Sequence, residues 1–255
     1  MKAILFLGAP GVGKTTAYAE LIRRRSFREA WITPEQAALK IARVRAQTGP
    51  VARKSLKLFA SRVPFLWRYV LKGALVSKEA ALSDEHRFRD FLSVCIECII
   101  AHAKSPVRFF YISRIPPRYL RTFGRFADTV GETVVFDGAH GELQQWVAGA
   151  LVSNDSRAIK RFFETMPLPA AIVYFRLSPA ESETRLRKRL QEGDIQNWWG
   201  MSEDEVVQCS KECVKIYATG LEILRSRGTK VLEVDAAQPV SENTARIEEF
   251  IRSFS

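Results

Sequence analysis

Short apolar runs alternate with longer amphipathic segments along this chain. The runs cover 3–7, 30–33, 133–137, 171–177 and 231–234. The run at 171–177 is apolar almost throughout, as in a strand that is buried on both faces of a parallel sheet. The pattern therefore predicts an α/β fold with a parallel sheet of about five strands.

The segments between these runs predict helices. Residues 14–25 place Ala17, Leu21 and Ile22 on one side, which is typical of a helix packed on a core. Ser178 followed by Pro179 is a favourable helix start. The other expected helices lie at 35–47, 56–75, 85–104, after Pro117, at 202–227 and from the last strand to about 252.

The connection between the first run and the first helix has the pattern G-x-x-x-x-G-K-[ST]. Glycines there let successive amides and the helix N-terminus point at one anion. Lys14 is expected to reach the β- and γ-phosphates, and the Thr15 hydroxyl to bind Mg²⁺. The alternative is a glycine-rich turn with a stray lysine. The residues predicted to contact a nucleoside triphosphate are Gly8, Gly11, Val12, Gly13, Lys14, Thr15 and Thr16.

Two carboxylates follow predicted strands. Asp137 ends the run at 133–137, and Glu35 follows the run at 30–33, at the sheet edge where open α/β sheets bind ligands. Asp137 can hold Mg²⁺ or take a proton from an attacking hydroxyl, and its alternative role is a helix N-cap. The nearby His140 is expected to be structural or peripheral.

The helix that begins after Ser178 is rich in arginine. Arg185 and Arg189 are four residues apart and share a helix face, so both guanidinium groups can converge on one polyphosphate. Phosphoryl transfer needs such cations because the charge on the moving group must be stabilised. The alternative is a basic helix that faces solvent.

The excess positive charge of the chain lies in one segment. Residues 34–131 contain 18 Lys and Arg against 7 Asp and Glu, a net charge of +11 that equals the net charge of all 255 residues. Such a segment can bind an anionic acceptor, a nucleic-acid backbone or an acidic membrane surface, or it can form a solvated face.

Composition favours a cytoplasmic protein with reduced thiols. No apolar run approaches the roughly 18 residues needed to span a bilayer, and the chain enters its first strand without a signal peptide. The four cysteines form pairs three and four residues apart, Cys95 with Cys98 and Cys209 with Cys213. Buried thiols are the favoured interpretation, and a four-cysteine metal site is the alternative.

Together these features resemble the nucleoside monophosphate kinase group, thymidylate kinase most of all, over about 170 residues. The resemblance implies one P-loop NTPase three-layer sandwich over 1–255, with strand order 2-3-1-4-5, a helical acceptor-binding region at 34–131 and a lid at 185–205. It implies ATP and Mg²⁺ as cofactors, and a homodimer is possible. Arg185, Arg187 and Arg189 match the lid arginines, and residues 236–239, with Ala237, match the loop that borders adenine.

The sequence is compatible with more than one class of phosphoryl acceptor. Thymidylate kinases follow the third-strand aspartate with an arginine that grips the acceptor phosphate, whereas Gly138 follows Asp137 here. Glu35 resembles the base of related deoxynucleoside kinases. The leading hypothesis is a kinase of a nucleoside monophosphate. The second is a kinase of a sugar or nucleoside hydroxyl with Glu35 or Asp137 as base. The third is a P-loop NTPase that binds a polyanion or a membrane.

Overall fold

The computed structural model describes residues 3–24, 31–34, 36–37, 40, 89–102, 113, 132–137, 156–193 and 202–254. Within these ranges, five strands form one sheet. The strands are β1 (Ala3–Leu7), β2 (Trp31–Ile32), β3 (Thr133–Phe136), β4 (Ala171–Arg176) and β5 (Lys230–Asp235). Each expected strand is therefore present, and no strand end differs from the expected one by more than one residue.

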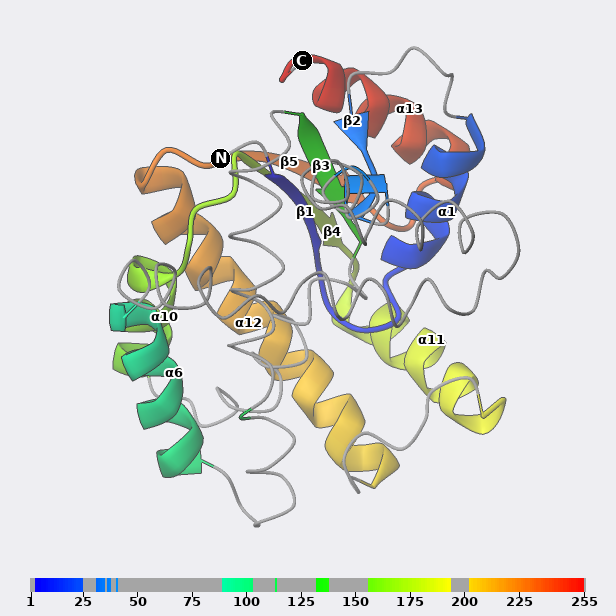
Figure 1. Ribbon diagram of the computed structural model, residues 1–255. Helices are drawn as coiled ribbons and strands as arrows, with labels where there is room; N and C mark the ends of the chain where they lie inside the picture. The colour runs from blue at the N-terminus through cyan, green and yellow to red at the C-terminus, as the bar shows by residue number, and fades with distance from the viewer. Residues whose placement is uncertain are drawn as a thin grey trace, which may run out of the picture.

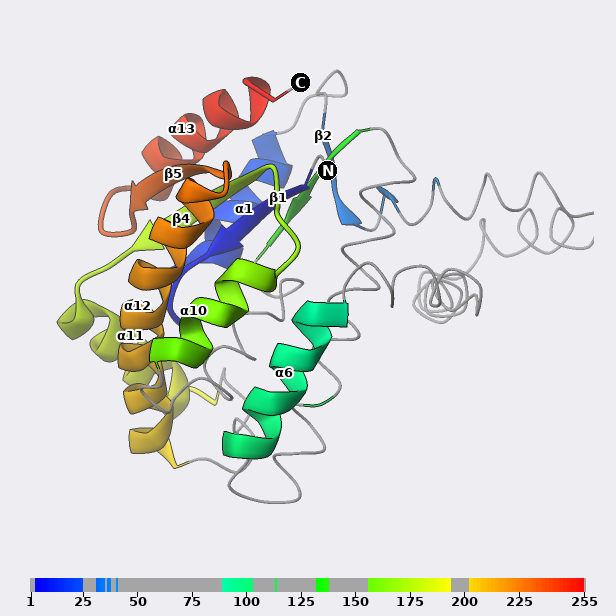
Figure 2. The same cartoon turned by 90° about the vertical axis from the view of Figure 1, so that its left-hand side faces the viewer.

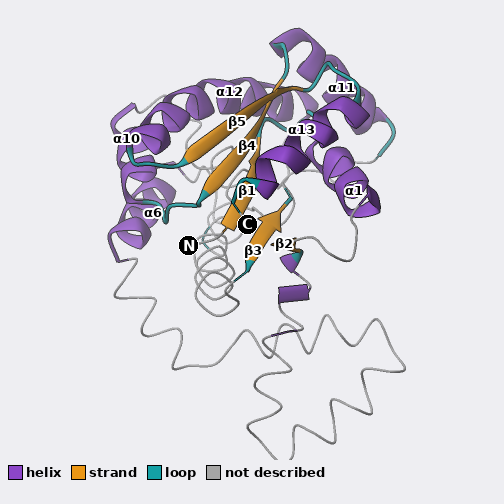
Figure 3. Cartoon of the chain, turned by 90° about the horizontal axis from the view of Figure 1, so that it is seen from above, coloured by secondary structure: helices purple, strands orange, loops and turns teal. Residues whose placement is uncertain are grey.

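The strands are all parallel and lie in the order β2-β3-β1-β4-β5, which confirms the predicted order. The central strand β1 pairs with β3 on one side and with β4 on the other. Because parallel strands end at the same edge, the segments that follow β1, β3 and β5 leave from one edge of the sheet (Figure 1, Figure 3). This arrangement is compatible with a P-loop NTPase-like sandwich.

Helices lie around the sheet. They are α1 (Lys14–Arg24), α6 (Arg89–His102), α10 (Ser156–Thr165), α11 (Pro179–Gln191), α12 (Glu203–Ser226) and α13 (Val240–Arg252). The sequence pattern did not identify α10. The helices expected at 56–75 and after residue 117 lie outside the described residues, as does most of the one expected at 35–47.

Two apolar layers cover the two faces of the sheet. Helices α1 and α13 cover one face, and α6, α10 and α12 cover the other (Figure 2). Along β1, Leu5 and Leu7 join the core beneath α12, whereas Ile4 and Phe6 join the core beneath α1. Both faces need apolar side chains, which explains why the strands appear in the sequence as continuous apolar runs.

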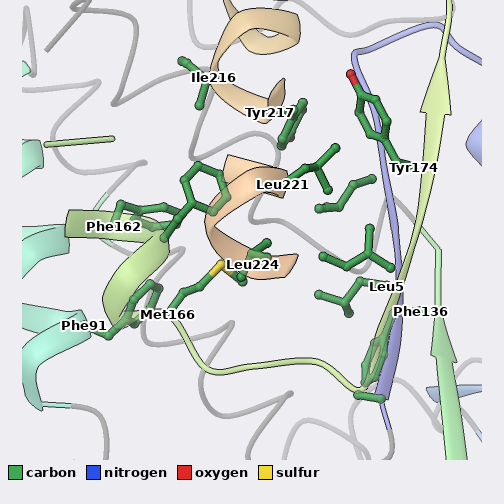
Figure 4. Packing of buried hydrophobic residues seen from close by; sticks show 14 of the residues in the cluster. Leu5, Phe91, Phe136, Phe162, Met166, Tyr174, Ile216, Tyr217, Leu221 and Leu224 are labelled. Atoms are coloured by element: carbon green, nitrogen blue, oxygen red, sulfur yellow. The ribbon is translucent and has the colours of Figure 1, made fainter. Parts of the chain in front are cut away.

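The longest described helix, α12, crosses the sheet and packs on its side chains. Figure 4 shows Leu221 and Leu224 of α12 facing Leu5 and Phe136 of the sheet. The N-terminus of α12 has a capping box, in which Ser202 accepts from the amide of Glu205 and the Glu205 carboxylate accepts from the amide of Ser202. The helix start expected at Ser202 is therefore confirmed.

A glycine allows α10 to approach α12 closely. A Cβ atom on Gly220 would overlap with the ring of Phe163, which is fully buried and packs edge-on against Phe162. The ring has little room to move because protein interiors are close-packed. Gly220 is therefore required by packing, although glycine is a poor residue for a helix interior.

We predict that Gly220→Ala destabilises the protein. Alanine favours the helix by about 1 kcal/mol, but overpacking typically costs about 1–3 kcal/mol, so a net loss of about 1 kcal/mol in the free energy of unfolding is expected. Urea denaturation measures this change. The exposed neighbour Thr219, changed to alanine, is the matched control. Unchanged stability in Gly220→Ala would contradict the packing argument, and adding Phe163→Leu should restore stability.

Candidate functional site

The connection between β1 and α1 is a tight loop, residues 8–13, here called the glycine loop. Gly8, Gly11 and Gly13 all have positive φ, and that of Gly8 is 150°. A Cβ atom on Gly8 would lie 2.7 Å from the backbone oxygen of Phe175 in β4. The residue therefore has to be glycine, because any side chain would push the loop away from the sheet.

Lys14, the first residue of α1, turns its side chain back over this loop. Its Nζ donates hydrogen bonds to the backbone oxygens of Gly8 (2.8 Å) and Ala9 (2.7 Å), and the residue is only 8% exposed. Burial lowers the pKa of the ammonium to about 7, although Cys213 and Asp137 act in the opposite direction. The two carbonyl groups partly compensate the desolvation of this charge.

A second charged group lies beside Lys14. Asp137 follows β3, is 5% exposed and interacts electrostatically with Lys14. The end of β3 is held to α1 because the Tyr18 hydroxyl donates to the backbone oxygen of Val135 at 3.2 Å. Thr15 is exposed in the first turn of α1, at the same edge of the sheet.

Two other residues predicted for this site differ in exposure. Thr16 is exposed beside Thr15, whereas Val12 is buried in the core beneath α1. Val12 therefore anchors the glycine loop by its side chain, and any contribution to a ligand would come from its backbone.

Helix α11 packs directly on the glycine loop. Its start is capped by Ser178, whose hydroxyl accepts from the amide of Glu181, as the sequence predicted. Leu186 is fully buried, and its backbone nitrogen lies 3.7 Å from the position of a Cβ atom on Gly11. The helix is therefore held against the loop at its middle, with Arg185 directly before Leu186 and Arg189 three residues after it.

These two arginines reach different parts of the site. Arg189 acts electrostatically on Lys14, whereas Arg185 donates from Nη1 to the backbone oxygen of Ala236 at 3.2 Å. The structure thus places Arg189 near Lys14 and Arg185 at the loop that follows β5.

Arg187 has a different environment from its two neighbours. It forms ion pairs with Glu183 on α11 and with Asp204 on α12, and Glu183 also pairs with Lys211 on α12. These contacts tie α11 to α12. In this structure the Arg187 side chain is therefore engaged with Glu183 and with Asp204 of α12.

The loop at 235–239 follows β5 at the same edge of the sheet. Arg176 of β4 pairs with Asp235, so this loop begins level with the end of β4. Ala237 is exposed there, and its amide donates to Asp235 Oδ1 at 3.0 Å. Through Arg185 and Ala236, the loop is connected to the helix that packs on the glycine loop.

The structure therefore groups Lys14, Asp137 and Arg189 around the glycine loop. Glu35 and His140 lie outside the described residues. Sequence reasoning missed Asn243, which contacts the 235–239 loop and is 3% exposed. The helical periodicity of the sequence could have indicated this residue. Asn243 stands four residues before Ile247 and eight before Ile251, which are buried in α13, so an apolar residue would be expected at its position.

All four cysteines are free thiols and buried. Burial raises the pKa of the Cys95 and Cys213 thiols well above the usual value. Within the described ranges, no group of three or more His, Cys, Asp or Glu side chains is arranged to hold a metal ion. In the same part of the chain, no helix is long and apolar enough to cross a membrane.

Comparison of the sequence with models of known protein families found no match, and comparison with curated proteins found no significant relative.

We predict a pH dependence of stability that comes from Lys14. The unfolded chain holds this proton up to about pH 10.5, whereas the folded protein releases it near pH 7. Between these values the unfolded state binds more protons, so stability rises with pH. Relative to Lys14→Met, the wild-type free energy of unfolding should rise by up to about 1.4 kcal/mol per pH unit between about pH 7 and pH 9.

Chemical denaturation of both proteins across this pH range measures the difference. The comparison cancels the contribution of the buried thiols, which both proteins share. Lys188 is an exposed lysine on α11, and Lys188→Met should leave the wild-type profile unchanged. Parallel profiles for wild type and Lys14→Met would show that the burial of Lys14 does not affect its protonation.

Proposed function

We propose that this protein is an ATP-dependent kinase that transfers the γ-phosphoryl group to a small acceptor, most simply a nucleoside monophosphate. We further propose that the fold is a P-loop NTPase sandwich in which 34–131 binds the acceptor and 185–205 forms a lid. The observation that carries the proposal is the buried Lys14 ammonium, which is bonded to two carbonyl groups of the glycine loop.

The glycine loop has the properties of a phosphate site. It ends at the N-terminus of α1, where the helix dipole and unpaired amides favour an anion. Charged phosphate oxygens are stronger acceptors than the two carbonyl groups that now bind Lys14. We expect Lys14 to move to the β- and γ-phosphates, which would restore its positive charge at neutral pH.

Arg189 and Arg185 provide further positive charge around the loop. Arg189 lies close enough to Lys14 to lower its pKa, so both cations can act on the same phosphate chain. Arg185 is bonded to Ala236, which suits a role at the base of the nucleotide beside Ala237. Cations supplied within the chain stabilise the charge of the transferring group.

The donor set also fits Mg²⁺. Thr15 offers a hydroxyl oxygen and Asp137 a carboxylate oxygen, and Mg²⁺ usually takes one or two protein oxygens together with substrate phosphates. When bound, the ion would neutralise charge on the β- and γ-phosphates. Asp137 directly follows β3, and the hydrogen bond from the Tyr18 hydroxyl to the oxygen of Val135 fixes the end of that strand to α1. This bond would keep the Asp137 carboxylate in place.

The proposed reaction exchanges two bonds at phosphorus. An acceptor oxygen forms a bond to the γ-phosphorus while the bond to the β–γ bridging oxygen breaks, and ADP leaves with that electron pair. An acceptor phosphate is already an anion and needs no base. The chain's contribution is then to bind and orient both substrates and to exclude water.

A hydroxyl acceptor is the second candidate. Asp137 is a buried carboxylate beside Lys14, and it is followed by Gly138 rather than by an arginine that could grip an acceptor phosphate. A hydroxyl has to lose its proton during transfer, and Asp137 or Glu35 would accept it.

The proposal predicts acceptor-dependent ADP release from Mg-ATP. A panel of nucleoside monophosphates, nucleosides and free sugars should contain at least one compound that stimulates turnover. Lys14→Ala should lower that turnover by about 100-fold or more, because it removes a cation from the phosphate site. Arg23→Ala removes an exposed cation from the same helix and should have little effect.

A panel without any stimulation, together with equal background rates for wild type and Lys14→Ala, would contradict the kinase proposal. If no acceptor stimulates turnover but background ATP hydrolysis still depends on Lys14, tight, salt-sensitive binding of nucleic acid or anionic vesicles would favour the polyanion-dependent NTPase.

Glu35→Gln distinguishes the two acceptor classes. If a hydroxyl is the acceptor and Glu35 is its base, the variant should lose about 100-fold or more in kcat. A monophosphate kinase should keep most of its activity. Steady-state kinetics with the best compound of the panel measures the difference, and Glu222→Gln, which changes an exposed carboxylate on α12, is the matched control.

A further inference from the structure

Helix α11 is attached to α12 by charged side chains. The Glu183 carboxylate of α11 lies 2.7 Å from Lys211 Nζ of α12 and 2.9 Å from Nη2 of Arg187, one turn along its own helix. Arg187 also donates to Asp204 of α12 at 3.0 Å. Hydrogen bonds from Lys211 and Arg187 lower the pKa of the Glu183 carboxyl, which is therefore ionised at neutral pH. Glu183 thus joins one cation from each helix, and Figure 1 shows α11 beside α12.

The apolar contact between these two helices is small. Within the described residues, it is a cluster separate from the two layers that cover the sheet, formed by Leu186, Val206, Val207 and Cys209. Ser182 of α11 and Ser210 of α12, both buried, line the crevice between the helices. An element with few buried apolar contacts has low local stability, and short side chains form low ridges that interlock weakly. The orientation of α11 therefore depends on the ion pairs as well as on packing.

The ion pairs and the arginines near the glycine loop lie on opposite sides of α11. At 3.6 residues per turn, Glu183 and Arg187 share one side, and Arg185 and Arg189 share a side that is about 160° away. A helix with its side chains has a radius of about 5–6 Å, so a rotation of about 20° moves a side-chain tip by about 2 Å. A misplacement of about 1 Å in an active site can reduce a rate by about 100-fold.

We propose that Glu183 and Lys211 are positioning residues that fix the orientation of α11 and thereby hold Arg189 beside Lys14 for phosphoryl transfer. The inference rests on the proposed function, in which Arg189 and Lys14 act on the same phosphate chain. Glu183 and Lys211 act through the orientation of the helix, and no bond to substrate forms or breaks at either side chain. Their contribution is a more favourable placement of the cation that stabilises the transferring group.

The exposure of these ion pairs sets the size of the expected effect. The Glu183, Arg187 and Lys211 side chains are 27%, 40% and 41% exposed. One ion pair with this exposure changes an equilibrium by no more than about fivefold. The pairs are therefore too weak to determine whether the protein folds. They are strong enough to favour one orientation of α11 over another that has nearly the same packing.

The test is a double-mutant cycle on kcat, measured as ADP release by the full-length protein with saturating Mg-ATP and the best acceptor of the panel. Glu183→Ala removes two ion pairs, so kcat should fall by about three- to tenfold. The KM for ATP should change little, because the glycine loop is unaltered. When Arg189→Ala is already present, Glu183→Ala should have no further effect on kcat, since the side chain that it positions is then absent.

Lys211→Ala breaks the same contact from the other helix. It should lower kcat in the same direction as Glu183→Ala and add nothing when the two are combined, because Glu183→Ala has already removed this ion pair. This variant also tests the inference if Glu183→Ala does not fold.

Two matched controls separate the ion pairs from other changes in α11. Glu192→Ala removes a carboxylate that pairs with Lys188 of the same helix, so it changes the charge without breaking a contact to α12. Ser182→Ala alters the buried contact with α12 without a change of charge, and its hydroxyl oxygen has no hydrogen-bond partner among the described residues. Both variants should keep the wild-type kcat.

An unchanged kcat in Glu183→Ala and Lys211→Ala would overturn the inference and leave the proposed function intact, provided that turnover still depends on Lys14. An equal loss of kcat in Glu183→Ala with and without Arg189 would also overturn it, because the ion pairs would then act on the fold as a whole. Absence of acceptor-dependent turnover in the wild type would overturn both proposals.

Discussion

The burial of one positive charge constrains the whole edge of the sheet. Lys14 begins α1, yet its ammonium is bonded to the backbone of the loop that precedes the helix. A charge in this position is stable only if polar groups replace the water that it has lost. The glycine loop supplies those groups, and its fold depends on the close contact of Gly8 with β4.

Helix α11 relates this loop to the rest of the site. The buried Leu186 at its centre packs on the loop. Arg189 acts electrostatically on Lys14, and Arg185 donates a hydrogen bond to the oxygen of Ala236. Arg187 lies on the opposite flank and joins α11 to α12 by ion pairs. Three arginines that look equivalent in the sequence thus have two kinds of environment, because residues two apart on a helix point in different directions.

Close packing and buried polar groups coexist in this fold for different reasons. Gly220 lets α10 approach α12, and its role is the packing of the core. Asn243 weakens the core because its Oδ1 has no hydrogen-bond partner among the described residues, but its Nδ2 holds the 235–239 loop. Natural proteins usually break a local packing rule where function requires it. The position of Asn243 among the apolar residues of α13 is an example that could be recognised from sequence periodicity.

Local patterns in the sequence determined the strands, the capped starts of α11 and α12 and the glycine loop, because each depends on neighbouring residues. Continuous apolar runs also indicated a parallel sheet covered on both faces, while the strand order came from a resemblance. Only the tertiary structure decided the burial of Lys14 beside Asp137 and Cys213, the separate environments of Arg185 and Arg187 and the tie between Asn243 and its loop. These features bring together residues that are distant in the chain, and the spacing of such residues along the sequence does not indicate that they are in contact.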